Sequence, residues 1–250
     1  MTDQTVIKYS PTGHPQTGLV TWDPIPPQLI ASGDPVQRGH QYFGTENDRV
    51  ISGVWDCTEF AQVRCPYEVD EFMIVLDGSI IIEDAAGRRQ VFRAGEAFIL
   101  PKYTDCAWIQ SEPALKYYFI HDNPNSKTPV DAESLSAIRI DTGAGLARVG
   151  DLDDAQFVGG IPDMGMNILY SDPSGKFSVG VWESGPMERV PGTLARSELM
   201  HILEGSGTII NGDGVEFRFN AGDTFLVPIG MGYRWHSEGY VKKIFCSYTP

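Results

Sequence analysis

The chain has 250 residues, 42% of them hydrophobic, and a formal net charge of -14 from 33 acidic and 19 basic residues. Its length suits two domains of roughly 100–150 residues better than a single core. The acidic balance argues against nucleic acid and anionic membranes as partners, because both bind basic surfaces. The start of the chain lacks a signal-peptide pattern, and no apolar run approaches the roughly 20 residues that span a bilayer. We therefore expect a cytoplasmic protein.

The first 40 residues are rich in proline, which breaks helices and cannot donate to a β-ladder. This composition predicts an extended arm, residues 1–40, that packs over the module following it. From residue 50 onward, short segments rich in β-branched and aromatic residues alternate with Gly, Pro and Asp. Such spacing predicts an all-β sandwich or barrel. The expected strands lie at 50–55, 60–64, 71–76, 79–83, 89–93, 97–100, 105–110 and 115–120.

The whole pattern occurs twice, at a constant offset of 127 residues. The offset relates glutamate, glycine, tryptophan, lysine and proline positions in the two halves: Glu71 and Glu198, Gly78 and Gly205, Gly95 and Gly222, Pro101 and Pro228, Trp55 and Trp182, Trp108 and Trp235, Lys116 and Lys243. A constant offset predicts a duplicated structural unit. We expect module one at 41–122, a linker at 123–150 with a short helix at 131–138, and module two at 151–250.

Two spacings in each copy of the repeat resemble the two halves of the cupin signature. In the first, a Gly follows a Glu after six intervening residues, and in the second, a Pro follows a Gly after five. The runs Gly-Val-Trp at 53–55, Asp-Glu-Phe at 70–72, Ala-Gly-Glu-Ala-Phe at 94–98 and Lys-Tyr-Tyr at 116–118 are similar to one cupin branch. That branch includes the ethanolamine-utilisation cupin and the ureidoglycine aminohydrolases. The resemblance covers residues 20–120 and 147–250 and implies an all-β protein of two tandem, RmlC-like jelly-roll barrels. It implies no single activity, because cupins host isomerases, oxygenases, hydrolases and non-enzymes.

Cupins bind a metal through His-x-His and Glu in the first half of the signature and a His in the second half. Module one has Cys65, Tyr67 and Cys106 at the three histidine positions, and module two has Gly192, Leu194 and Tyr233. None of the five histidines stands at a ligand position. We therefore predict no cofactor, and for module two a packed barrel lined by Leu194, Met200 and Ile202.

Module one still offers a group of polar side chains. By strand alternation, Cys65 and Tyr67 share a face with Glu71, and Cys106 joins them from the second half of the signature. If a metal is bound, Zn²⁺ or another divalent ion would be held by these four residues, since thiolate, phenolate and carboxylate mix soft and hard ligands. The alternatives are that the cysteines are small buried hydrophobes or form a Cys65–Cys106 disulfide.

Each module also combines a signature glutamate with a lysine near its last strand. A carboxylate inside a barrel requires a partner, so Glu71 can pair with Lys116 and Glu198 with Lys243. Salt-bridge partner and metal ligand remain two open roles for Glu71. Trp108 is expected in the core, or in the wall of a ligand pocket.

These residues favour a bicupin that binds a small polar metabolite in module one without the usual metal, with Cys65, Cys106 and Trp108 contacting the ligand. The alternative is an enzyme of small amino- or ureido-compound catabolism, hydrolase- or isomerase-type, in which Tyr67 and Glu71 act as acid and base. A homodimer is compatible with either function.

Overall fold

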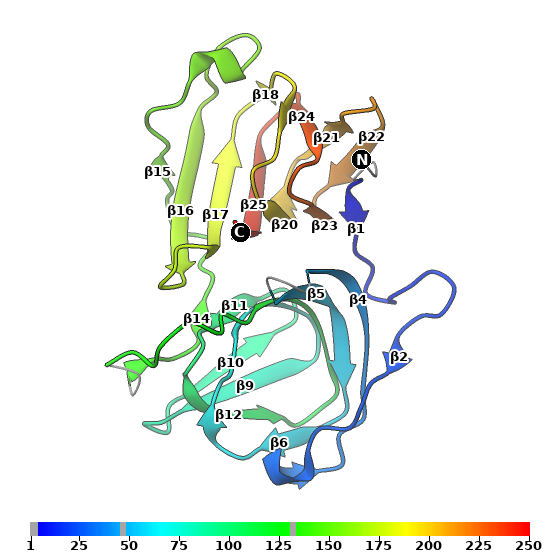
Figure 1. Ribbon diagram of the computed structural model, residues 1–250, viewed down its shortest axis with the longest axis vertical. Helices are drawn as coiled ribbons and strands as arrows, with labels where there is room; N and C mark the ends of the chain where they lie inside the picture. Colours follow the sequence, from blue (N-terminus) through cyan, green and yellow to red (C-terminus); the bar gives the residue numbers. More distant parts are fainter. Residues whose placement is uncertain (1–4, 46–48, 131–133) are drawn as a thin grey trace. The chain divides into compact units, whose positions relative to one another are not determined.

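The computed structural model describes residues 5–45, 49–130 and 134–250. The chain forms two compact units, which we call the first unit, residues 10–140, and the second unit, residues 5–9 with 141–250 (Figure 1). Each unit consists of antiparallel strands arranged in two sheets. Among the described residues, no helix is long and apolar enough to cross a membrane.

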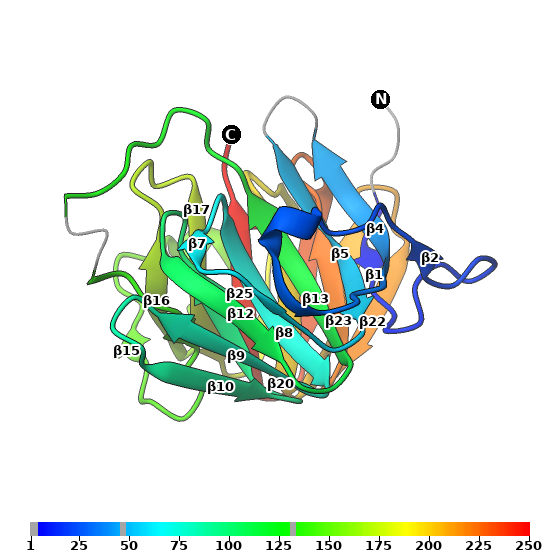
Figure 2. The same cartoon turned by 90° about the horizontal axis from the view of Figure 1, so that it is seen from below.

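The first unit has a seven-stranded sheet and a smaller sheet, both with their strands antiparallel. The order in the larger sheet is β14 (Ile138–Arg139), β11 (Ala97–Leu100), β8 (Asp70–Asp77), β13 (Ala114–His121), β5 (Val50–Cys57), β4 (Gln37–Thr45), β2 (Val20–Thr21). The order in the smaller sheet is β10 (Arg89–Arg93), β9 (Ser79–Asp84), β12 (Asp105–Gln110), β6 (Phe60–Gln62), β3 (Ile30–Gly33), and β7 (Cys65–Pro66) also pairs with β12. Figure 2 shows β10, β9 and β12 side by side. A short 3-10 helix, η1 (Pro27–Leu29), precedes β3.

The second unit repeats this arrangement. Its larger sheet has the order β1 (Ile7–Lys8), β23 (Thr224–Val227), β20 (Ser197–Glu204), β25 (Val241–Tyr248), β17 (Phe177–Ser184), β16 (Met164–Ser171), β15 (Ala147–Arg148). Its smaller sheet has the order β18 (Met187–Glu188), β24 (Gly232–Ser237), β21 (Ser206–Asn211), β22 (Glu216–Asn220), and β19 (Gly192–Thr193) pairs with β24. The 3-10 helix η3 (Asp154–Gln156) precedes β16.

The all-β class and the expected strands are confirmed, with ends that differ by one or two residues. The expected strand at 60–64 ends early, at Gln62, because the chain turns there toward β7. Of the helix expected at 131–138, residues 131–133 lie outside the described residues. Residues 135–137 are not helical and Ile138 begins β14, so the expectation is wrong for that part.

The proline-rich arm is divided between the two units. Its later strands, β2 and β3, pair with β4 and β6 of the first unit. Its first strand, β1, instead pairs with β23 of the second unit. The expectation that the whole arm packs over module one is therefore wrong for β1.

The first glycine of the signature occupies a tight turn in each unit. Gly78 has φ +71° and Gly205 has φ +83°, a region that L-residues with a side chain rarely adopt. A Cβ at Gly78 would lie 2.2 Å from the carbonyl oxygen of Pro113, and one at Gly205 would lie 2.1 Å from that of Tyr240. Both copies of the repeat therefore contain a close backbone approach, at the turn between β8 and β9 and at the turn between β20 and β21.

Each unit has its own core, and the two cores contain matching tryptophan pairs. The rings of Trp55 and Trp108 meet edge to face at 6.0 Å, and those of Trp182 and Trp235 at 5.8 Å. In the first unit, Phe92 stacks on Phe98 at 3.9 Å. The tryptophan pairs form one wall of each barrel interior, next to the buried lysine.

Candidate functional site

A buried ion pair lies inside the first unit. Lys116 on β13 donates from Nζ to Oε1 of Glu71 on the neighbouring strand β8 at 2.7 Å, and both side chains are almost fully buried. The ammonium also lies 4.9 Å from the ring centre of Trp55 and 4.5 Å from that of Trp108. Burial lowers the pKa of Lys116, and Glu71 opposes that fall. The expected pairing of Glu71 with Lys116 is thus confirmed.

Tyr67 is hydrogen-bonded to the second oxygen of the Glu71 carboxylate. Its hydroxyl donates to Oε2 of Glu71, so both carboxylate oxygens accept a hydrogen bond. The backbone of Tyr67 is tied to the turn before β12, since its N–H donates to Thr104 O at 2.9 Å and its carbonyl accepts from Tyr103 at 2.7 Å. Burial raises the pKa of Tyr67 well above its usual value, and Glu71 raises it further. The phenol is therefore protonated at neutral pH and acts as a donor.

The two cysteines lie opposite one another on paired strands. Cys65 on β7 is directly across from Cys106 on β12, and both are free thiols. Cys106 is buried and Cys65 is half-buried. Burial raises the pKa of Cys106 to about 12 and also raises that of Cys65. Both sulfurs are thus thiols, not thiolates, at neutral pH, and neither is an activated nucleophile.

A cavity of about 710 Å³ opens beside these residues, and all of its lining belongs to the first unit. The lining combines apolar side chains with an amide, a thiol, two phenols, two carboxylates and one lysine: Leu29, Gln62, Cys65, Pro66, Tyr67, Glu68, Val69, Lys102, Tyr103, Asp122. Of the predicted site residues, Cys65 and Tyr67 line this cavity.

The remaining predicted residues lie deeper. Trp108 lines a smaller cavity of about 190 Å³ beside Lys116, and its indole N–H donates to Gln110. Another cavity of about 190 Å³ is lined by Glu71, Lys116 and Tyr118. The buried hydroxyl of Tyr118 has no hydrogen-bond partner among the described residues. Cys106 belongs to the buried core cluster against which Tyr67 packs.

The second unit contains a related ion pair with a different second partner. Lys243 donates to Oε1 of Glu198 at 2.7 Å, which confirms the predicted pairing, and Arg196 donates from Nε to Oε2 at 2.6 Å. Burial alone would raise the pKa of Glu198, but Lys243 and Arg196 together outweigh it and lower the pKa to about 2. Arg196 thus replaces the tyrosine of the first unit.

A cavity of about 80 Å³ lies inside this second barrel. Leu194 and Met200 line it as expected, and Ile202 lies in the surrounding core. Four charged side chains also line the cavity: the predicted pair Glu198 and Lys243, and two arginines that were not predicted there, Arg189 and Arg196. The positions equivalent to 189 and 196 in module one are uncharged, so the signature alone does not reveal these arginines.

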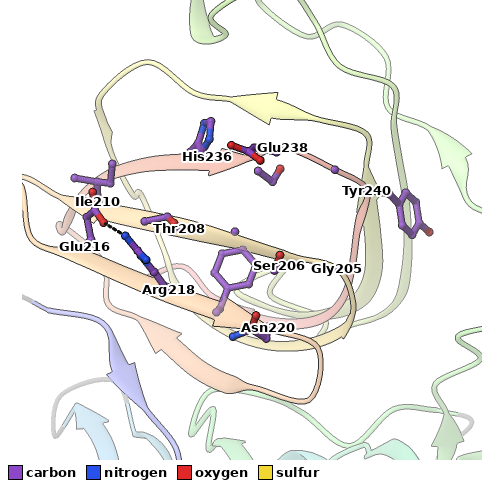
Figure 3. Close-up of a pocket in the computed structure, with 14 residues that line it drawn as sticks. Gly205, Ser206, Thr208, Ile210, Glu216, Arg218, Asn220, His236, Glu238 and Tyr240 are labelled. Atoms are coloured by element: carbon purple, nitrogen blue, oxygen red, sulfur yellow. Dashed lines mark hydrogen bonds and ion pairs between the residues drawn. The ribbon is translucent and has the colours of Figure 1, made fainter.

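A further hollow, of about 590 Å³, lies on the smaller sheet of the second unit (Figure 3). Thr208, Glu216, Arg218 and His236 point into it from strands whose alternate residues face the core. The Arg218 and Glu216 side chains are 80% and 51% exposed, and exposed ion pairs of this kind contribute little energy. We regard this hollow as an open sheet face and not as the candidate site.

Comparison with known families agrees with the repeat. Residues 44–118 and residues 171–245 each match the model of the EutQ-like cupin domain, and together they make up more than half of the chain. The chain belongs to the EutQ-like cupin family. The two matches stand at the same offset as the internal repeat, so the bicupin expectation is confirmed.

Solved structures also resemble this cupin. A Pseudomonas syringae pv. tomato protein of unknown function, from the DUF861 family, has a TM-score of 0.78 and 21% identity, over 98% of this chain and 100% of that chain. Ylba from E. coli, also of the DUF861 family, has a TM-score of 0.56 and 11% identity, over 97% and 93%. A salicylate 1,2-dioxygenase from Pseudaminobacter salicylatoxidans has a TM-score of 0.52 and 12% identity, over 80% and 70%.

At these identities the solved structures share the fold alone with this cupin. No curated protein matches the sequence.

The residues of this cupin do not fit the metal that the fold often holds. The one carboxylate at the signature position of the first barrel accepts from both Lys116 and Tyr67. A divalent cation bound there would face the ammonium of Lys116 at close range, and like charges in a buried site are strongly unfavourable. In the second barrel, Glu198 is held by two cations, and an imidazole ligand is absent from both signature sets.

Proposed function

We propose that this bicupin binds a small polar metabolite at the mouth of its first barrel, without the usual cupin metal. The observation that carries the proposal is the position of Tyr67. Its side chain lines the 710 Å³ cavity, and its hydroxyl contacts the buried Glu71–Lys116 pair. A ligand in the cavity would therefore meet a protonated phenol whose orientation is set by a buried charge pair.

The size of the cavity supports this assignment. Small-molecule sites commonly measure about 300–1,000 Å³ and combine apolar walls with a few polar groups. The cavity at Tyr67 falls in that range, whereas the interior cavities of about 190 Å³ and 80 Å³ fall below it. Leu29, Pro66 and Val69 supply its apolar wall.

The polar lining favours a ligand that is rich in N–H donors. Glu68 supplies carboxylate oxygens and Gln62 supplies an amide, whereas both oxygens of Asp122 already accept from cations, Lys102 and Arg49. The single lysine, Lys102, is already paired with Asp122, at 2.9 Å. Since the Tyr67 hydroxyl donates to Glu71, its own oxygen remains able to accept from a ligand N–H. Small amino and ureido compounds, the class that the family resemblance implies, match this pattern of acceptors.

Calorimetric titration of untagged, chelator-treated protein with N-carbamoylglycine, glycine, ethanolamine and urea tests the proposal. We expect saturable binding of at least one compound, weakened about ten-fold or more by Tyr67→Phe, because loss of a hydrogen bond in a buried site costs about 1–3 kcal/mol. The matched control is Tyr233→Phe, which removes the phenol of the second barrel and should leave this binding unchanged. Absence of binding by all four compounds, or unchanged binding by Tyr67→Phe, would reject the site.

An acid–base enzyme is the second candidate, and one observation favours it. The hydroxyl of Tyr67, the carboxylate of Glu71 and the ammonium of Lys116 form a hydrogen-bonded chain that begins at the cavity wall. Such a chain can take a proton from a bound ligand onto the Tyr67 oxygen while the Tyr67 proton moves to Glu71, and can then return a proton to the ligand by the reverse transfer. Turnover of the same compounds, followed by NMR, would distinguish the two functions. Loss of turnover with retained binding in Glu71→Gln would favour the enzyme.

A further inference from the structure

The interior of the second barrel carries an excess of positive charge. Arg189, Arg196 and Lys243 line its cavity, against the single carboxylate of Glu198. Two of the cations, Lys243 and Arg196, already share that carboxylate, at 2.7 and 2.6 Å. Lys243 and Glu198 are buried, whereas Arg189 and Arg196 are partly exposed, so an anion that enters from solvent can reach the two guanidinium groups.

Arg189 is the cation with the weakest compensation. Its guanidinium donates to the neutral amide oxygen of Gln156 at 2.6 Å and lies 5.3 Å from the ring centre of Phe157. Among the described residues, no carboxylate lies within ion-pair distance of it. Arg189 and Arg196 both lower the pKa of Lys243 in addition to the effect of burial, because their positive charges lie near its ammonium.

The first barrel provides an internal comparison. At the repeat offset, Gln62 stands for Arg189 and Val69 stands for Arg196. The interior of the first barrel therefore contains one cation, Lys116, and one anion, Glu71, and the two charges cancel. The two added arginines are a property of the second barrel alone and are not needed to hold the shared glutamate and lysine together.

From this geometry we propose that the second barrel binds a short-chain monocarboxylate, whose carboxylate lies between Arg189 and Arg196. The cavity of about 80 Å³ holds only a few non-hydrogen atoms, since one water needs about 10–15 Å³ of such space. The rest of its wall consists of the phenol of Tyr233 and apolar side chains that include Met164, Met187 and Phe245, and the apolar part suits a short hydrocarbon end. The Arg196 side chain is 48% exposed and provides the way in.

Two arginines are well suited to this role. A guanidinium offers its N–H donors in a fixed planar fork that matches the two oxygens of a carboxylate. Inorganic ions such as chloride could satisfy the charge, but they would not use the apolar wall. The site is separate from the cavity at Tyr67, so it can be present whether or not the first barrel binds a metabolite.

The test is calorimetric titration of the full-length, untagged protein with acetate and propionate in a buffer free of chloride. Acetamide, a neutral analogue of acetate, and sodium chloride are titrated in parallel. We expect acetate and propionate to bind, and acetamide and chloride to bind at least ten-fold more weakly. Arg189→Gln and Arg196→Val, which install the residues of the first barrel, should each weaken acetate binding about ten-fold or more, as expected for loss of a charged hydrogen bond. Tyr67→Phe should have no effect.

Circular dichroism and thermal melting establish that each variant is folded. Arg189→Gln is the more informative change, because Arg189 does not support Glu198. The proposal is overturned if the wild type shows no saturable binding up to tens of millimolar, if acetamide or chloride binds as tightly as acetate, or if both folded arginine variants bind acetate like the wild type. If Tyr67→Phe loses binding of N-carbamoylglycine and still binds acetate, the loss belongs to the first barrel and the second-barrel proposal stands.

Discussion

Removing the buried lysine should destabilise the two barrels unequally. Lys116→Met and Lys243→Met remove the ammonium and keep the rest of an unbranched side chain, one atom shorter, that can still pack against the tryptophans. In the first barrel, Glu71 is then left with one neutral donor, Tyr67. In the second barrel, Glu198 retains the guanidinium of Arg196 at 2.6 Å.

The expected magnitudes follow from these partners. Breaking a buried ion pair by removing one member costs about 3–5 kcal/mol, which we expect for Lys116→Met. After Lys243→Met, Glu198 keeps a charged partner, Arg196, whereas Glu71 keeps only a neutral hydroxyl after Lys116→Met, so the loss for Lys243→Met should fall below that range. Burial lowers the pKa of both lysines, so removing either also removes an unfavourable burial, and the lower end of the range is expected for Lys116→Met.

Urea unfolding and calorimetry would measure the two losses, and hydrogen exchange of β8 and β20 would show which unit each variant weakens. The double variant Glu71→Gln with Lys116→Met should recover part of the loss, because no buried charge then remains unpaired. Equal losses in Lys116→Met and Lys243→Met, or an additive double variant, would refute the assigned roles of Tyr67 and Arg196.

Three further outcomes are expected. Because the pKa of Glu198 falls from 4.5 to about 2 on folding, its contribution to stability is complete above about pH 4.5 and is lost as the pH falls through 2. At about 1.4 kcal/mol per unit this contribution is at most about 3.5 kcal/mol, and acid unfolding of Glu198→Gln should lack that loss. Iodoacetamide should modify half-buried Cys65 in native protein, and buried Cys106 and Cys246 only after unfolding. Mass spectrometry of digests would measure the three modification rates, and equal rates in native protein would contradict the difference in burial. Elemental analysis of untagged protein should find no stoichiometric metal, and added Zn²⁺ should leave the melting temperature unchanged; a one-to-one metal would contradict the poor fit of the site.

Much of the fold is readable from the sequence because it depends on local patterns and on the repeat. Gly78 and Gly205 mark turns with positive φ, which only the backbone of glycine adopts easily. The pairing of each glutamate with a lysine also follows from the repeat, since both members recur at one offset and a buried carboxylate requires a partner.

Other features depend on side chains that the repeat does not share. Arg196 reaches Glu198 from the residue just before β20, which begins at Ser197, and its spacing of two residues from Glu198 is that of one strand face, but its equivalent in the first unit is Val69. Strand alternation relative to Glu198 is the signal that could have found it. Pairing of β1 with β23 joins segments far apart in the chain, and neither segment carries a local signal for it. The cavity at Tyr67 depends on how Leu29 and the β7 turn meet, which no spacing in the sequence specifies.

Protection of Cys65 tests the proposed metabolite site most directly, because this thiol and Tyr67 line the same cavity. Chelator-treated protein would be labelled with iodoacetamide in the presence and absence of N-carbamoylglycine, glycine, ethanolamine or urea. A metal-free site predicts that at least one compound slows modification of Cys65 in the wild type and does so much less in Tyr67→Phe. Unchanged labelling with every compound, or protection that requires added metal, would contradict it.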